Sequence, residues 1–177
     1  MKKQLPRGFT LVEMIISVAL LAVIGLLMNM ILLNSMRAIL KAQSVKEVKQ
    51  TGDFAMSVIT QRLRNAVSVA SCTAAMNTIT LMNPDGTTTT ISVVEDPPGS
   101  GVRKIRADTG GAIQILTTSN NVTVNTTNTL VFNCTSTTGR IGITYVLDHV
   151  RSANLPFEQR ASISYATTVV LRNWYMW

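Results

Sequence analysis

The feature that most constrains this chain is a run of twenty residues, Met14 to Leu33, that contains no charged side chain. Within it only Ser17 and Asn29 are clearly polar. An α-helix needs about 20 apolar residues to cross about 30 Å of hydrocarbon. The run therefore predicts a single membrane-spanning helix.

The residues around this run divide the 177-residue chain into unlike parts. A basic stretch with Lys2, Lys3 and Arg7 precedes the run, whereas Thr, Ser, Asn and Gly dominate from Thr73 to Thr144. Subtracting those three cations from the formal net charge of +7 leaves +4. The composition favours one globular domain behind a membrane anchor.

The basic stretch ends at Gly8, directly before the apolar segment. A conventional secretory signal has an apolar core of about 7 to 15 residues and loses it at a small-x-small cleavage site. No such site closes this segment, so a cut at Gly8 would remove the leader and keep the anchor. The leader cations place the N-terminus in the cytoplasm, and Arg37 and Lys41 weaken this assignment without reversing it.

Glu13 is a carboxylate at the edge of the membrane helix, where charge is costly, by about 2.5 to 3.5 kcal/mol at a helix centre. Thr10 and Glu13 have capping-box spacing, and the free N–H groups of a first turn favour an anion. A cut after Gly8 would also create an α-amine on Phe9, and the ammonium of a neighbouring subunit could neutralise Glu13. Both interpretations stay open, because they can hold at different stages.

The sequence from Gly8 to Met14, GFTLVEM, resembles the class III signal of type IV pilins and type II secretion pseudopilins. The resemblance implies that a prepilin peptidase cuts after Gly8 and methylates Phe9, and that Glu13 guides filament assembly. It implies a single-pass inner-membrane precursor with its head outside the cytosol, and later a periplasmic or extracellular filament. The implied partners are other pilin or pseudopilin subunits, the peptidase, an inner-membrane assembly platform and, before assembly, membrane lipid.

Two features bear on the kind of subunit. Met30 stands where many major pilins have a helix-breaking proline, so melting of the helix on assembly is not predictable. The segment from Ala161 to Asn173 looks like the closing strand of minor pilins and pseudopilins, including the larger J or W types, with an ordinary amphipathic strand as the alternative. The resemblance favours a minor pilin or pseudopilin and leaves pilus, competence and secretion filaments open.

Apolar residues continue at helical spacing after Leu33, and no proline occurs between Pro6 and Pro84. We predict one helix from about Thr10 to about Ser71, with Gly52 as a point where it can kink. Its second half is expected to pack on a sheet rather than form a free coiled coil. The stripe that carries this prediction consists of Met36, Ile39, Leu40, Val48, Ala55, Ile59, Leu63, Ala66 and Ala70.

From Thr78 the hydrophobic period changes toward two, which indicates strands. Turn sequences at 83–86 and 108–111 predict hairpins that join 78–81 to 90–93 and 102–105 to 112–115. Further strands are expected at 122–124, 130–132, 141–147, 163–165 and 168–171. The predicted fold class is α+β, a long N-terminal helix packed on a C-terminal antiparallel sheet. Its expected parts are a leader (1–8), a membrane and assembly helix (9–33), an amphipathic helix (34–71) and a β-rich head (72–177).

Cys72 and Cys134 are the two cysteines of the chain. With one histidine and no Cys-x-x-Cys spacing, the sequence predicts no metal site, and no cofactor motif occurs. A disulfide is favoured if the head lies outside the cytosol, and it would stabilise by roughly 4 kcal/mol for a loop of about 60 residues. Two unpaired buried thiols are the alternative.

The densest basic cluster is formed by Arg103, Lys104 and Arg106. It raises the alternative of a filament-borne adhesin or DNA-uptake module that binds polyanions. Nucleic-acid grooves normally combine cations with stacking rings, and no aromatic residues interleave here, so solvated faces are the favoured interpretation.

Catalysis needs clustered titratable groups, and this sequence offers few. His149 beside Asp148 has no positioned nucleophile, so we expect a surface or strand-end histidine. The sequence predicts a substrate of a peptidase rather than an enzyme. A plain single-pass membrane protein that keeps Met1 to Gly8 is the remaining alternative.

Overall fold

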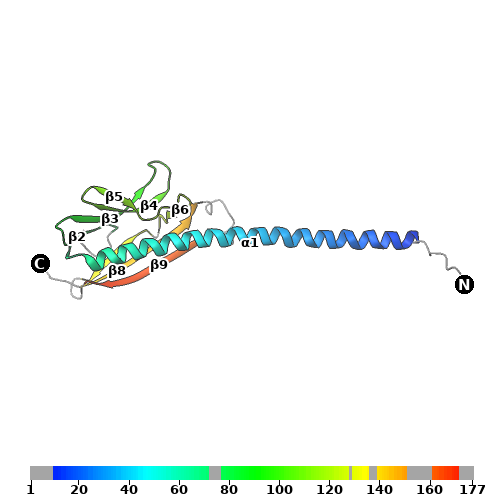
Figure 1. Cartoon of the computed structure of the whole chain (residues 1–177), viewed down its shortest axis with the longest axis horizontal. Coiled ribbons are helices and arrows are strands. Elements are labelled where there is room, and N and C mark those ends of the chain that lie inside the picture. Colours follow the sequence, from blue (N-terminus) through cyan, green and yellow to red (C-terminus); the bar gives the residue numbers. More distant parts are fainter. Residues whose placement is uncertain (1–9, 72–76, 128, 136–138, 151–160, 172–177) are drawn as a thin grey trace, which may run out of the picture. The chain divides into compact units, whose positions relative to one another are not determined.

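The structure of the protein is a computed structural model that describes residues 10–71, 77–127, 129–135, 139–150 and 161–171 (Figure 1). The chain divides into two compact units, Met1–Leu40 and Lys41–Trp177.

One helix, α1 (Leu11–Asn65), contributes to both units. It contains no proline, Glu13 lies in its first turn, and Arg62 and Arg64 lie in its last turn, where each charge suits the helix dipole. The helix runs through Gly52, the point where we expected that it can kink, without interruption.

The helix ends earlier than predicted, at Asn65 instead of about Ser71. The residues that follow form strand β1 (Ser68–Ser71), which pairs with strand β2 (Ile79–Met82) and packs Val69 against the core. The Val67 amide already donates to the Met82 carbonyl at 2.8 Å. Pairing with β2 therefore outweighs continuation of the helix here, because β-branched residues suit a half-buried strand.

The first sheet is an antiparallel meander in the order β1-β2-β3-β4-β5, and it contains both predicted hairpins. Strands β2 (Ile79–Met82) and β3 (Thr88–Glu95) flank a turn in which Gly86 has φ of 79°. Strands β4 (Arg103–Thr109) and β5 (Ala112–Ile115) flank Gly110 and Gly111. Glycine adopts positive φ at little cost, and this lets both chain reversals close.

The second sheet is built around the long strand β8 (Arg140–His149). Strands β6 (Val122–Val124) and β7 (Val131–Thr135) pair with successive parts of one edge of β8. Strand β9 (Ser162–Val170) pairs with the other edge over its whole length. The two short strands predicted at 163–165 and 168–171 are thus one continuous strand.

Residues of both sheets and of the second half of α1 form one hydrophobic cluster in the unit Lys41–Trp177. The helix contributes the predicted positions Val48, Ala55, Ile59 and Leu63, each with an exposed fraction of 0%. Arg62 also joins the helix to the first sheet, because its Nη1 donates to Thr109 Oγ1 at 2.8 Å. Met36, Ile39 and Leu40, predicted to continue this stripe, are exposed.

The predicted fold class is confirmed: the chain has a long N-terminal helix packed against C-terminal antiparallel sheets, an α+β architecture. The expected single sheet is two sheets. The first ends after β5, where the chain leaves the meander and the Leu116 amide bonds to the Ile105 carbonyl.

Candidate assembly surface and the helix seat of the head

The first turn of α1 is capped by Thr10. The Glu13 amide donates to Thr10 Oγ1 at 3.3 Å, and the Met14 amide donates to the Thr10 carbonyl at 3.2 Å. These bonds form one half of the predicted capping box, the half in which the Thr side chain serves the helix. The Glu13 side chain is exposed, and no ion pair joins it to another residue that the structure describes.

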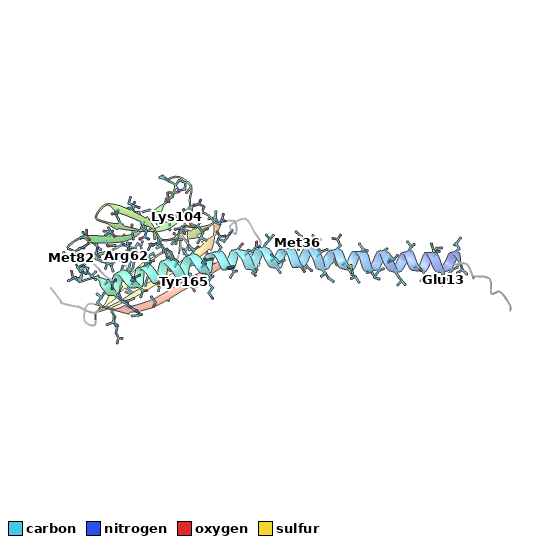
Figure 2. The ribbon with its side chains drawn as sticks, viewed as in Figure 1. Glu13, Met36, Arg62, Met82, Lys104 and Tyr165 are labelled. Carbon is cyan, nitrogen blue, oxygen red and sulfur yellow. The ribbon has the colours of Figure 1, made fainter. Side chains whose placement is uncertain are left out.

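The helix from Leu11 to Leu40 presents an apolar surface in every direction, as its side chains in Figure 2 show. One of its polar groups is satisfied locally, because the Ser17 hydroxyl donates to the Glu13 carbonyl at 2.7 Å. The helix includes a segment long and apolar enough to cross a membrane, with a mean hydropathy of 2.7 over 18 residues. The large apolar side chains exposed here are Leu11, Val12, Met14, Ile15, Ile16, Val18, Leu20, Leu21, Val23, Ile24, Leu26, Leu27, Met28, Met30, Ile31, Leu32, Leu33, Met36, Ile39 and Leu40.

Residues 5–29 match the prokaryotic N-terminal methylation motif. This motif indicates a type IV pilin-like protein. A search among curated proteins gave no match to the chain. A search among solved structures gave none either.

For a pilin-like protein the motif implies processing by a prepilin peptidase and assembly with other pilins. Proteins of this family are structural subunits rather than enzymes. The predicted processing residues Gly8 and Phe9 fall inside the matched segment and outside the residues that the structure describes. Thr10 and Glu13 therefore mark the described end of the motif.

In the head of this pilin-like chain, two tyrosines hold the second half of α1. The Tyr145 hydroxyl donates to the Gly52 carbonyl at 2.8 Å, and the Tyr165 hydroxyl donates to the Lys49 carbonyl at 3.0 Å. Their rings stack with centroids 5.0 Å apart. A Cβ added at Gly52 would collide with the Tyr165 ring, so Gly52 is the residue that allows this close approach.

Burial acts on both phenols. It raises the pKa of Tyr145, with smaller contributions from Tyr165 and Asp53. Burial also raises the pKa of Tyr165 to about 12, and the Asp53 carboxylate adds to this effect. Both hydroxyls therefore stay protonated donors across the neutral range, as the bonds to the helix carbonyls require.

A second contact between α1 and the sheets involves the unique histidine, which the sequence predicted at the surface or at a strand end. His149 is the last residue of β8 but is only 6% exposed, and its Nε2 lies 3.5 Å from Glu47 Oε2 on α1. Glu47 Oε1 also accepts bonds from Ser119 Oγ and Asn121 Nδ2. The bond from Ser119 is the largest cause and lowers the pKa of Glu47. Burial, the second-largest cause, raises this pKa, and the bond from Asn121 and the interactions with His149 lower it further.

The cations Arg103, Lys104 and Arg106 do not form one exposed patch. Lys104 is 5% exposed, and its Nζ donates to Asn120 Oδ1 at 2.9 Å and lies 3.9 Å from Asp96 Oδ2. Side chains alternate along a strand, so Arg103 lies on the opposite face of β4, where its Nη2 donates to Thr129 Oγ1 at 3.2 Å. Arg106 is half-buried. The structure thus gives Arg103 and Lys104 internal partners.

The predicted disulfide joins a described residue to one that is not described. Cys134 lies on β7, partly buried against the core, and Cys72 lies outside the described residues. The pairing stays a prediction. Among the described residues, no group of three or more His, Cys, Asp or Glu side chains is placed to hold a metal ion.

Proposed function

We propose that the chain is the precursor of a minor pilin or pseudopilin, a structural subunit of a type IV pilus, competence or type II secretion filament. The precursor inserts in the inner membrane with its leader in the cytoplasm and its head outside. A prepilin peptidase cuts after Gly8 and methylates Phe9. The mature chain then enters the filament through its apolar helix.

The observation that carries this proposal is the surface of α1 directly behind the methylation motif. From Leu11 to Leu40 every residue is exposed, and most side chains are large and apolar. A soluble monomer rarely leaves so large an apolar surface in water, because each buried large side chain is worth about 1.5 to 3 kcal/mol. Lipid covers this surface before assembly, and helices of other subunits cover it afterwards.

In the proposed assembly step, Glu13 supplies a negative charge that pairs with a neighbouring subunit. Its exposed carboxylate has no ion pair among the described residues, and the helix N-terminus compensates only part of its charge. Cleavage after Gly8 would create a positively charged α-ammonium group on Phe9. In a bundle of apolar helices, that ammonium on a neighbouring subunit would pair with Glu13, because burial makes an unpaired carboxylate costly.

The choice of a minor pilin or pseudopilin is supported by the closing strand. Strand β9 ends at Val170, within the segment whose sequence resembles the last strand of such subunits. The arrangement of Arg103 and Lys104, which bond to the head itself, gives no support to a polyanion-binding adhesin.

The proposal is tested at the N-terminus of the protein purified from cells that contain a prepilin peptidase. Mass spectrometry is expected to find a chain that begins at Phe9 with one added methyl group. A chain that begins at Met1 would show a plain membrane protein and overturn the proposal. Deletion of the gene, followed by assays of piliation, DNA uptake and protein secretion, would then identify the machine.

A further inference from the structure

Strand β9 is the edge of its sheet. It pairs with β8 in an unbroken register, from Ser162 opposite Asp148 to Val170 opposite Arg140. Its other edge bonds to no backbone group among the residues that the structure describes. A row of N–H and C=O groups along a nine-residue strand is therefore available to an extended chain.

This edge lacks the features by which proteins usually protect an exposed strand. The sequence SISYATTVV contains no charged residue and no proline, and no bulge interrupts the pairing with β8. Short strands, edge lysines, prolines and bulges are the common defences against edge-to-edge pairing. Strand β9 is therefore long, uncharged and regular, as expected of an edge strand that pairs with a strand of another chain.

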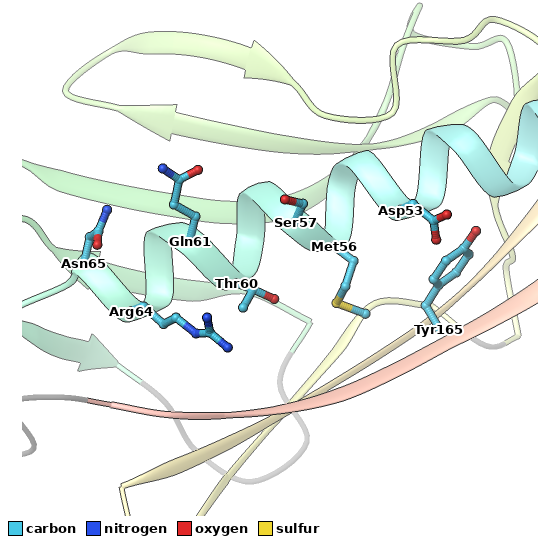
Figure 3. A pocket seen from close by; sticks show the side chains of 8 residues that line it. All are labelled: Asp53, Met56, Ser57, Thr60, Gln61, Arg64, Asn65 and Tyr165. Carbon is cyan, nitrogen blue, oxygen red and sulfur yellow. The ribbon is translucent and has the colours of Figure 1, made fainter.

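A hollow lies beside β9 on each face of the sheet. On the helix side a hollow of about 500 Å³ separates α1 from β9, and its lining includes Asp53, Met56, Arg64 and Tyr165 (Figure 3). On the other face a hollow of about 270 Å³ is lined by Ser164 and Ala166 of β9 together with residues of β8, of the chain before β7 and of the start of β7. An added strand would thus find room for its side chains on both faces, as β-augmentation requires.

The same head carries a second neutral edge, β5. This strand, Ala-Ile-Gln-Ile, ends the first sheet, and among the described residues its backbone pairs only with β4. Ile113 on β5 is 61% exposed, although it is large and apolar. The head therefore has one strand that offers an exposed apolar side chain and another that borders an outer hollow containing valine and alanine side chains.

We propose that β9 of one subunit receives β5 of a second copy of this chain, and that Ile113 of the second copy enters the hollow bordered by Ser164 and Ala166. A second copy fits this edge because its β5 supplies the exposed apolar side chain of Ile113, and both strands are uncharged and so meet without like-charge repulsion. Pairing of β9 with β5 joins different surfaces, and such a heterologous contact can repeat along a filament, whereas pairing of β9 with itself closes as a dimer. This proposal rests on the proposed function, because the proposed filament would bring many copies of the chain side by side.

The test uses the full chain in detergent and follows hydrogen exchange of the amides of β9 as protein concentration rises. Pairing is expected to protect these amides at high concentration. Ala166→Lys on β9 and Ile113→Lys on β5 are each expected to weaken self-association by at least about tenfold, because each places a charge in the contact. Met82→Lys is the matched control. Met82 is an exposed apolar residue in the same sheet as Ile113, and it lies outside the proposed contact.

A mixture of the two variants decides the geometry. An Ala166→Lys chain keeps its β5 and an Ile113→Lys chain keeps its β9, so the mixture is expected to form dimers while each variant alone stays monomeric. Loss of association with Ala166→Lys but not with Ile113→Lys would overturn the pairing with β5. Unchanged protection in both variants would overturn the whole proposal, and a normal methylated Phe9 in the same preparation would show that the filament function stands without it.

Discussion

The two halves of α1 have the same secondary structure and opposite surroundings. From Leu11 to Leu40 the helix exposes large apolar side chains, whereas from Lys41 to Asn65 it buries one apolar stripe, Val48, Ala55, Ile59 and Leu63, in the core and leaves Phe54 exposed. The second half is covered by the chain's own sheets and held by Tyr145, Tyr165 and Glu47. The first half needs a cover from outside the chain, and the comparison therefore separates what this protein does alone from what it does in lipid or in a filament.

The largest expected effect comes from Glu13 in the exposed half. Glu13→Ala is expected to leave membrane insertion and cleavage intact and to reduce incorporation into filaments by about a hundredfold. This corresponds to a cost of roughly 3 kcal/mol for leaving the Phe9 ammonium of the neighbouring subunit unpaired among apolar helices. Immunoblots of sheared filaments and of membranes would measure the ratio. Asn34→Ala, a polar change on the same exposed segment, is the control and is expected to change nothing. Normal incorporation of the Glu13 variant would refute its role in assembly.

The two glycines of α1 sharpen the comparison, because one lies in each half. A Cβ added at Gly52 meets the Tyr165 ring, while one added at Gly25 has no atom within 4 Å. Gly52→Ala is expected to destabilise the head by about 2 kcal/mol, since overpacking outweighs the gain of about 1 kcal/mol in helix propensity. Thermal unfolding in detergent would measure this loss. Gly25→Ala is expected to be neutral or slightly stabilising, and equal effects at both positions would contradict the asymmetry.

The sequence predicted what depends on local chemistry and missed what depends on distant contacts. The turn at 83–86 fixed the hairpin that places Ile79 opposite Ile91, because Pro84, Asp85 and Gly86 suit a tight turn wherever it occurs. By contrast, the same local rules offered Gly52 only as a point where the helix can kink, whereas the structure shows that the absence of a Cβ there makes room for the Tyr165 ring. The partner of Gly52 lies far along the chain, and a sequence pattern contains no sign of that contact.

The candidate site divides in the same way. Thr10 and Glu13 were predicted from spacing, and the structure contains the bond from the Glu13 amide to Thr10. His149 was expected at the surface or at a strand end, and its burial against Glu47 depends on how β8 packs on the helix. Lys104 was grouped with its neighbours by sequence proximity, but alternation along β4 and the contact with Asn120 separate it from Arg103.

A smaller effect is expected from the hydroxyl of Tyr165. Its folded-state pKa is raised to about 12, above the ordinary value of 10, chiefly by burial. A raised pKa means that the neutral phenol stabilises the fold below pH 10 and that this contribution is lost as the pH rises toward 12. Tyr165→Phe is expected to cost about 1 kcal/mol at neutral pH and to flatten this alkaline loss. Unfolding curves between pH 8 and 12 would test it, and an unchanged alkaline slope in the variant would assign the loss to other groups.

The smallest expected effect concerns how Glu47, which contacts His149, contributes to stability at acid pH. The pKa of Glu47 is lowered from 4.5, mainly by the bond from Ser119, so its carboxylate stabilises the fold above pH 4.5 and this contribution is lost as the pH falls below that value. The Glu47 side chain is 36% exposed, and solvent therefore limits the effect to about 0.5 kcal/mol. Glu47→Gln is expected to lower stability at pH 7 by this amount and to remove this acid dependence below pH 4.5. Glu95→Gln, on β3, is the control for general acid effects. If both variants lose stability in parallel with the wild type as the pH falls, the acid sensitivity arises elsewhere, and the contact between α1 and the sheets depends on Arg62, the tyrosines and the apolar core rather than on Glu47.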